Sequence, residues 1–140
     1  MISKEIAQKL MDEALIAQTF SYSPYSSFQV GAALLSKSGK IYRGCNIENV
    51  AFGPTNCAER TAIFKAVSEG DKDFEAIAIV GNPKGKKRDK GDYCSPCGVC
   101  RQVMAEFCDK DFNVILGNNK DDYKIYTLEE ILPLTFTNIN

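Results

Sequence analysis

A chain of 140 residues with 44% hydrophobic and 25% charged side chains suits one domain with a single core, and we expect that domain to span residues 1–140. Its formal net charge of -1 gives no general attraction to nucleic acids or anionic membranes, so we expect a small or weakly charged ligand and neither of those partners. The chain contains no histidine, which excludes Ser-His-Asp and Cys-His nucleophile systems and any metal site that needs imidazole.

Apolar residues at helical spacing predict a first helix over residues 4–19, with Ser3 as a suitable N-cap. The residues expected on its inward face are Ile6, Leu10, Ala14 and Ala17. This opening segment alternates charged and apolar residues and lacks the apolar run of a signal peptide or a membrane span. We therefore expect a cytoplasmic protein.

Two strands are expected next. The almost wholly apolar segment 28–35 predicts a strand that is covered on both faces. Residues 36–40 predict a hairpin turn in which Gly39 is free to adopt a positive φ. A second strand is predicted over residues 41–48.

The middle of the chain predicts a second helix over residues 57–69, which Thr55 or Asn56 would cap, and a third strand over residues 75–81. The inward face of this helix is expected to contain Ala62, Ala66 and Val67.

A polar loop is expected over residues 82–93, followed by a third helix over 97–108. Two strands follow at 112–117 and 124–127, and a last helical turn at 128–132. Ser95 is a suitable N-cap for the third helix, and Pro96 suits the first helical position. This order of elements predicts a three-layer α/β domain in which helices pack on a mixed sheet.

The main chemical signal is Cys57, with Glu59 two residues later, followed about forty residues on by Cys97 and Cys100. Two cysteines at i and i+3 share a helix face, so both thiolates can reach one tetrahedral ion at ~2.3 Å. Three thiolates leave the fourth position of Zn²⁺ open for water, as in a catalytic site. Glu59 can border the same pocket only if the metal lies off the end of the helix, because residues two apart do not face each other on a regular helix.

Other uses of the six cysteines stay open. A CxxC pair also occurs in structural zinc sites and in redox proteins, and Cys94 as a fourth ligand would close the site. Cys45 and Cys108 are most simply small buried residues. A disulfide framework is disfavoured, because the cytosol keeps thiols reduced.

At these residues the sequence resembles the small cytidine deaminases whose zinc is held by three cysteines. The segments that carry the resemblance are YSPYSSFQVGAALL, GCNIEN, NCAERTA, SPCGVCRQV and EILP, and they cover nearly the whole chain in the right order. The resemblance implies a cytidine-deaminase-like fold, with a mixed five-stranded sheet and helices on both faces. It also implies a homotetramer.

The resemblance implies a role for each matching residue. It assigns zinc to Cys57, Cys97 and Cys100, and proton transfer to Glu59. The implied substrate-binding residues are Phe28 for the pyrimidine, Asn46 and Glu48 for the ribose, and Ala58 for the base through its backbone. Arg60 is implied to hydrogen-bond a ligand thiolate, and the tail residue Phe136 to complete the pocket of a neighbouring subunit.

Elementary chemistry agrees with these roles but does not require them. Asn46 and Glu48 would share a face of an extended segment, and an amide with a carboxylate suits a sugar diol. The same two residues also fit an ordinary turn after a strand. Without the resemblance, Phe28 would be assigned to the core and Arg60 to a helix surface.

The activity implied is zinc-dependent hydrolytic deamination of the free nucleosides cytidine and deoxycytidine, giving uridine, deoxyuridine and ammonia in pyrimidine salvage. The zinc deaminases as a class use this chemistry, with a non-ligand glutamate as acid and base. Alternatives are a deaminase of a blasticidin-type antibiotic, a nucleotide or polynucleotide deaminase, and a structural zinc module. The basic segment 84–90 is a solvated loop or, alternatively, a polyanion contact.

Overall fold

The computed structural model describes residues 1–139. Within this range the elements are α1 (Lys4–Gln18), β1 (Phe28–Ser36), β2 (Ile41–Cys45), α2 (Ala58–Ser68), β3 (Phe74–Pro83), α3 (Gly98–Phe107), β4 (Asn113–Asn119), β5 (Asp122–Thr127) and α4 (Leu128–Ile131). Every helix and strand expected from the sequence is present, with bounds that shift by a few residues.

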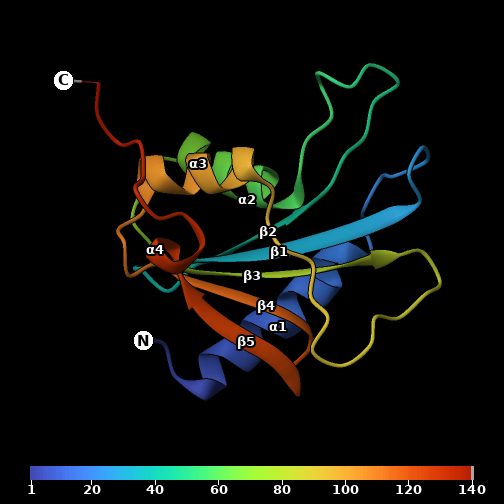
Figure 1. The fold of residues 1–140 in the computed structure, drawn as a ribbon, viewed down its shortest axis with the longest axis horizontal. Coiled ribbons are helices and arrows are strands. Elements are labelled where there is room, and N and C mark those ends of the chain that lie inside the picture. Colours follow the sequence, from blue (N-terminus) through green and yellow to red (C-terminus); the bar gives the residue numbers. More distant parts are fainter. Residues whose placement is uncertain (140) are drawn as a thin grey trace.

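The strands form one mixed sheet in the order β2-β1-β3-β4-β5. Strands β3 and β4 are parallel, and the other neighbouring pairs are antiparallel. Helix α1 lies on one face of the sheet, and α2 and α3 lie on the other (Figure 1). The predicted three-layer α/β architecture with a mixed five-stranded sheet is therefore confirmed.

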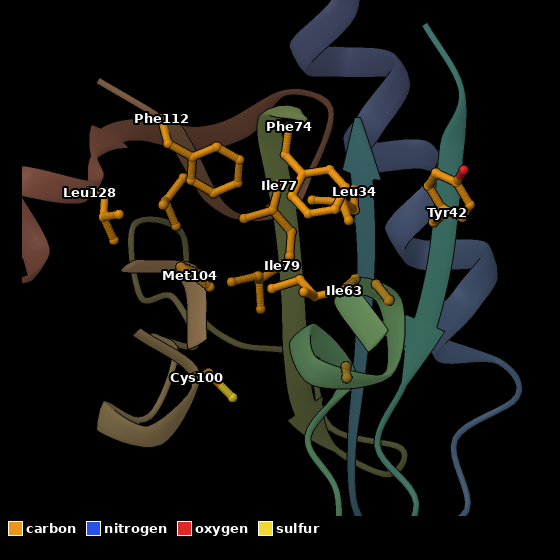
Figure 2. Packing of buried hydrophobic residues seen from close by; sticks show 14 of the residues in the cluster. Leu34, Tyr42, Ile63, Phe74, Ile77, Ile79, Cys100, Met104, Phe112 and Leu128 are labelled. Carbon is orange, nitrogen blue, oxygen red and sulfur yellow. The ribbon is translucent and has the colours of Figure 1, made fainter. Parts of the chain in front are cut away.

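Strand β3 separates two hydrophobic cores, because successive side chains of a strand point to opposite faces. Ile77 and Ile79 pack under α2 and α3, and Figure 2 shows Cys100 at the margin of this core, next to Met104. The alternate residues of β3 pack under α1, together with Leu10 and Met11. Burial on both faces explains why the central strands contain apolar runs rather than alternating patterns.

The sheet topology brings distant parts of the chain to one edge. Strands β2 and β3 are both antiparallel to β1, so they are parallel to each other and their carboxyl ends point the same way. The chain leaves β2 toward α2 and leaves β3 toward α3 at this edge. The start of β1 also lies there, since Phe28 pairs with Pro83 at the end of β3. We call this end of the sheet, where β2 and β3 finish and β1 begins, the site edge.

Several local predictions were correct. Ser3 caps α1 by accepting from the backbone N–H of Ile6, and Gly39 has a φ of 95° in the β1–β2 turn.

Other local predictions were wrong. Ile6 is exposed, and Ala7 and Met11 are buried instead, because a step of one residue turns the helix by ~100°. The caps of α2 and α3 are Cys57 and Cys97 rather than Thr55, Asn56 or Ser95. Both cysteines have an extended backbone, and the Sγ of Cys97 accepts from the backbone N–H of Cys100.

Candidate metal centre

Three thiols meet at the site edge, each at the start of a helix. Cys57 is the N-cap of α2, Cys97 is the N-cap of α3, and Cys100 lies in the first turn of α3. Their Sγ atoms all lie within 4.8 Å of one another, with 3.8 Å between Cys57 and Cys97 and 3.4 Å between Cys97 and Cys100. Two thiolates at ~2.3 Å from a tetrahedral Zn²⁺ are ~3.8 Å apart, so this donor set fits zinc with one position left over.

Positive charge surrounds the thiols. The two helix N-termini contribute partial positive charge. Arg60 lies one turn into α2 and donates from Nη2 to the Sγ of Cys57 over 3.3 Å, the contact that the resemblance implied. The pKa of Cys57 falls to about 5, because the thiol of Cys100 and then the guanidinium of Arg60 stabilise its thiolate. A metal cation placed among these thiols would therefore meet one sulfur that deprotonates readily.

Glu59 is buried beside these thiols, with 4% of its surface exposed. Burial raises the pKa of its carboxyl group to about 7, and the neighbouring charge of Cys57 adds to the rise. The carboxyl group can share the pocket with Cys57 because that cysteine is an extended cap residue, with φ -77° and ψ 155°, and does not lie on the helical face. The geometric condition set by the two-residue spacing is therefore met. A carboxyl group with this pKa can accept and release a proton near neutral pH.

Cys94 stays outside the cluster. Among residues 1–139, the group whose ligand atoms lie close enough for one metal consists of Cys57, Cys97 and Cys100 alone. Cys94 instead packs on the backbone of Gly81, and burial raises the pKa of its thiol to about 11. An inert, protonated thiol does not close the fourth metal position.

Asn46 is buried, and most of the hydrogen-bonding capacity of its side-chain amide is used by other residues of the chain. Its Nδ2 donates to the carbonyl oxygen of Phe28 over 2.8 Å, and its Oδ1 accepts from the backbone N–H of Val30 over 2.9 Å and from the hydroxyl of Ser21. An amide offers two N–H donors and two acceptor positions. Within the described chain, one N–H donor of Asn46 is thus left for a ligand.

Glu48 also supports the backbone around it. Its Oε1 accepts from the backbone N–H groups of Tyr25 and Ser26 over 3.0 and 3.1 Å, and its Oε2 accepts from the hydroxyl of Ser26. These hydrogen bonds, that of the Ser26 hydroxyl foremost, lower the pKa of the carboxyl group. Glu48 therefore remains an anionic acceptor, and its structural role in the turn before β1 was not foreseen.

Comparison with known proteins places this geometry in a family. The model of the cytidine and deoxycytidylate deaminase zinc-binding region matches residues 4–116. The chain belongs to this family. A cytidine deaminase of Halalkalibacterium halodurans is 53% identical over 130 residues, which cover 93% of each chain. The crystal structure of a cytidine deaminase from Burkholderia pseudomallei matches with a TM-score of 0.81 and 41% identity, over 91% of this chain and 97% of that one. A blasticidin-S deaminase of Bacillus cereus is 38% identical over 77% of this chain and 76% of its own.

In this cytidine deaminase fold, the remaining residues implied by the resemblance lie at different places. Ala58 is the fully buried first residue of α2, where a backbone N–H has no partner within the helix. Phe136 follows α4, and its carbonyl oxygen accepts from Gln102 of α3 over 2.8 Å. The residue is 64% exposed, so one chain alone leaves it largely in solvent.

Arg88 was missed by sequence reasoning. It belongs to the basic loop, yet its guanidinium covers the ring of Phe28, with 5.5 Å between Cζ and the ring centroid. The expectation of a solvated loop fits Lys86 and Lys87, which are exposed, and is wrong for Arg88. No local pattern distinguishes this arginine from its neighbours, because the contacts that bury it are with Phe28 of β1 and Gly81 of β3.

Proposed function

We propose that this protein is a zinc-dependent cytidine deaminase that converts cytidine and deoxycytidine with water to uridine, deoxyuridine and ammonia, as in pyrimidine salvage. The observation that carries the proposal is the buried carboxyl group of Glu59, with a pKa raised to about 7, beside three thiols spaced for one tetrahedral ion. A structural zinc module needs no such proton carrier next to its metal.

Zinc held by Cys57, Cys97 and Cys100 supplies Lewis-acid activation of water when bound. Glu59 accepts a proton from the attacking water on its carboxylate and delivers a proton to N3 of the cytosine ring. The carboxylate then takes the remaining proton from the new C4 hydroxyl group and transfers it to the amino group. The C4–N bond breaks, ammonia leaves and C4 becomes the carbonyl carbon of uridine. A carboxyl group with a pKa of about 7 both accepts and donates protons readily near neutral pH, because neither its protonated nor its ionised form is strongly favoured.

The substrate would enter at the site edge. Phe28 offers its ring to the pyrimidine, and the backbone of Ala58 lies at the start of α2, next to the thiols. The free N–H of Asn46 and the carboxylate of Glu48 supply one donor and one acceptor for the ribose hydroxyls. An anionic Glu48 at the sugar repels a nearby phosphate, which supports a free nucleoside rather than a nucleotide as substrate.

The test is ammonia release by the purified zinc protein from cytidine, deoxycytidine, deoxycytidylate, a cytosine-containing oligonucleotide and blasticidin S. We expect turnover of the two nucleosides, little on the phosphorylated substrates, and none after removal of zinc by a chelator until zinc is restored. Preferential release from deoxycytidylate, the oligonucleotide or blasticidin S would refute the proposed substrate class. Absence of turnover on every substrate would favour a structural zinc module.

We further propose that the protein is a cytoplasmic homotetramer. Two loops at the site edge, joined by isolated bridges between Tyr22, Ile47 and Asn56, expose the apolar side chains of Phe20, Val50 and Phe52. Large exposed apolar groups on neighbouring loops are typical of interaction surfaces. Among residues 1–139, no helix is long and apolar enough to cross a bilayer.

In a tetramer, the exposed ring of Phe136 would complete the pocket of a neighbouring subunit. Truncation after Pro133 should then raise the KM for cytidine or lower kcat, and light scattering should show a tetramer for the full-length protein. A monomer in solution, or a truncated enzyme with full-length kinetics, would contradict this role of the tail.

A further inference from the structure

The ring of Phe28 contacts parts of the basic loop and of β3. The guanidinium of Arg88 lies over the ring, with 5.5 Å between Cζ and the ring centroid. The backbone of Gly81 lies against the ring as well, because a Cβ atom there would come within 3.2 Å of the ring atom Cε1 of Phe28. The same absent Cβ would meet the Sγ of Cys94 at 2.7 Å, so Gly81 permits both side chains to approach β3.

Arg88 is itself fixed by two further contacts. Its Nε donates to the carbonyl oxygen of Gly81 over 2.6 Å, and its Nη1 pairs with Asp92 over 3.1 Å. The side chain is only 21% exposed. A guanidinium that is bound at Nε and Nη1 and lies over a ring has few N–H groups left for an external polyanion. The alternative of a polyanion contact therefore does not extend to this residue.

The segment that carries Arg88 is a folded structure rather than a loose loop. The hydroxyl of Tyr93 donates to Asp122 of β5 over 2.6 Å, and the backbone N–H of Gly91 donates to the same carboxylate over 3.3 Å. Asn118 of β4 bridges Asp122 and the carbonyl oxygen of Asp89, over 2.8 and 3.2 Å. These contacts anchor the loop on the β4–β5 hairpin, and Arg88 reaches from it to Phe28.

Phe28 needs such support because little of the sheet surrounds it. It is the first residue of β1, it is only partly buried, and Ser27 before it has a φ of 58°, which a non-glycine residue rarely adopts. An aromatic ring that receives a substrate base binds more tightly when its rotamer is already fixed, since less conformational freedom is lost on binding.

We propose that Arg88 is a positioning residue that fixes the ring of Phe28 for the cytosine base. This inference rests on the proposed function, in which Phe28 contacts the pyrimidine. Arg88 acts through Phe28 on binding and takes no part in proton transfer, so its loss should weaken the ground state and the transition state alike. Such a change raises KM and leaves kcat unaltered.

The kinetic test compares Arg88→Met with Lys87→Gln, which removes one exposed charge from the neighbouring position of the same loop. We expect the KM of Arg88→Met for cytidine to rise about 5- to 10-fold with kcat within about twofold, as for a partly desolvated cation–π contact. The Lys87→Gln enzyme should keep both constants. Zinc content and thermal midpoint are measured for each variant, and Arg88→Lys replaces Arg88→Met if the latter does not fold.

A double-mutant cycle with Phe28→Leu separates positioning of the ring from general damage to the loop. If Arg88 acts through the ring, Arg88→Met should change KM by less than about twofold in the Phe28→Leu background. An equal increase in both backgrounds, or a wild-type KM for Arg88→Met, would overturn the proposal.

A second readout does not depend on turnover. In protein with 13C-labelled phenylalanine, the ring signals of Phe28 are those that Phe28→Leu removes. They should shift or broaden in Arg88→Met and remain unchanged in Lys87→Gln. Unchanged ring signals in Arg88→Met would refute positioning. If the signals change in Arg88→Met but the wild-type protein deaminates no nucleoside, only the proposed function is refuted.

Discussion

Gly44→Ala should damage the active site through the packing of α2 on β2. A Cβ atom at Gly44 would lie 2.4 Å from the carbonyl oxygen of Ala58 and 2.5 Å from the backbone nitrogen of Ala62. Real Cβ atoms essentially never approach other heavy atoms closer than 3.0 Å, so the helix must retreat by at least the difference between 3.0 and 2.4 Å, about 0.6 Å. Both obstacles are backbone atoms, which a change of rotamer cannot move aside.

The expected losses of stability and of catalytic rate follow from the position of these backbone atoms in α2. Overpacking of this kind costs ~1–3 kcal/mol of stability. Ala58 stands between Cys57 and Glu59, so a shift of the first turn of α2 moves the proposed zinc ligand and the proposed proton carrier together. A misplacement of ~1 Å in an active site can cost ~10²-fold in rate, so we expect kcat/KM for cytidine to fall by about one to two orders of magnitude.

The assay is denaturant unfolding, zinc content and nucleoside kinetics on Gly44→Ala and on the control Gly53→Ala. Gly53 has nothing within 4 Å of its Cβ position and no positive φ, so its substitution should leave stability unchanged. A Gly44→Ala protein with the unfolding midpoint and kcat/KM of the wild type would refute the reasoning, since it would mean that α2 accommodates the methyl group without moving its first turn.

Four other substitutions test the site itself. Glu59→Gln should keep zinc and the fold while kcat falls by at least ~10²–10⁴-fold, the typical contribution of acid–base catalysis, and near-normal ammonia release would exclude Glu59 as the proton carrier. Cys97→Ala should lose stoichiometric zinc in metal analysis while Cys94→Ala keeps it; the reverse result would mean that the donor set has been assigned wrongly. Arg60→Gln should lower kcat and speed zinc transfer to a chelator, because the thiolate of Cys57 loses its cation, and unchanged zinc retention would show that the helix N-termini suffice.

The sequence alone determined much of this protein, because the relevant signals are local. Turn residues and apolar periods placed the helices and strands, as with Gly39 in the hairpin and Ser3 at the first cap. The spacing of Cys97 and Cys100 predicted that both thiols lie together at the start of one helix. The linked motifs around Cys57 indicated the family before any fold was known. These features depend on residues a few positions apart, for which backbone geometry is nearly independent of the rest of the chain.

Only the tertiary structure decided what depends on contacts between distant segments. Strand order brought the ends of β2 and β3 to one edge, and there Cys57 became the cap of α2 in place of the residues that capping preferences favoured. The same long-range packing means that the amide of Asn46 makes hydrogen bonds mainly with backbone groups. It also means that Arg88, although it belongs to a basic loop, packs on the ring of Phe28. Spacing in the sequence carries no information about such contacts, because the partners are chosen by sheet topology and by burial rather than by local conformational preference.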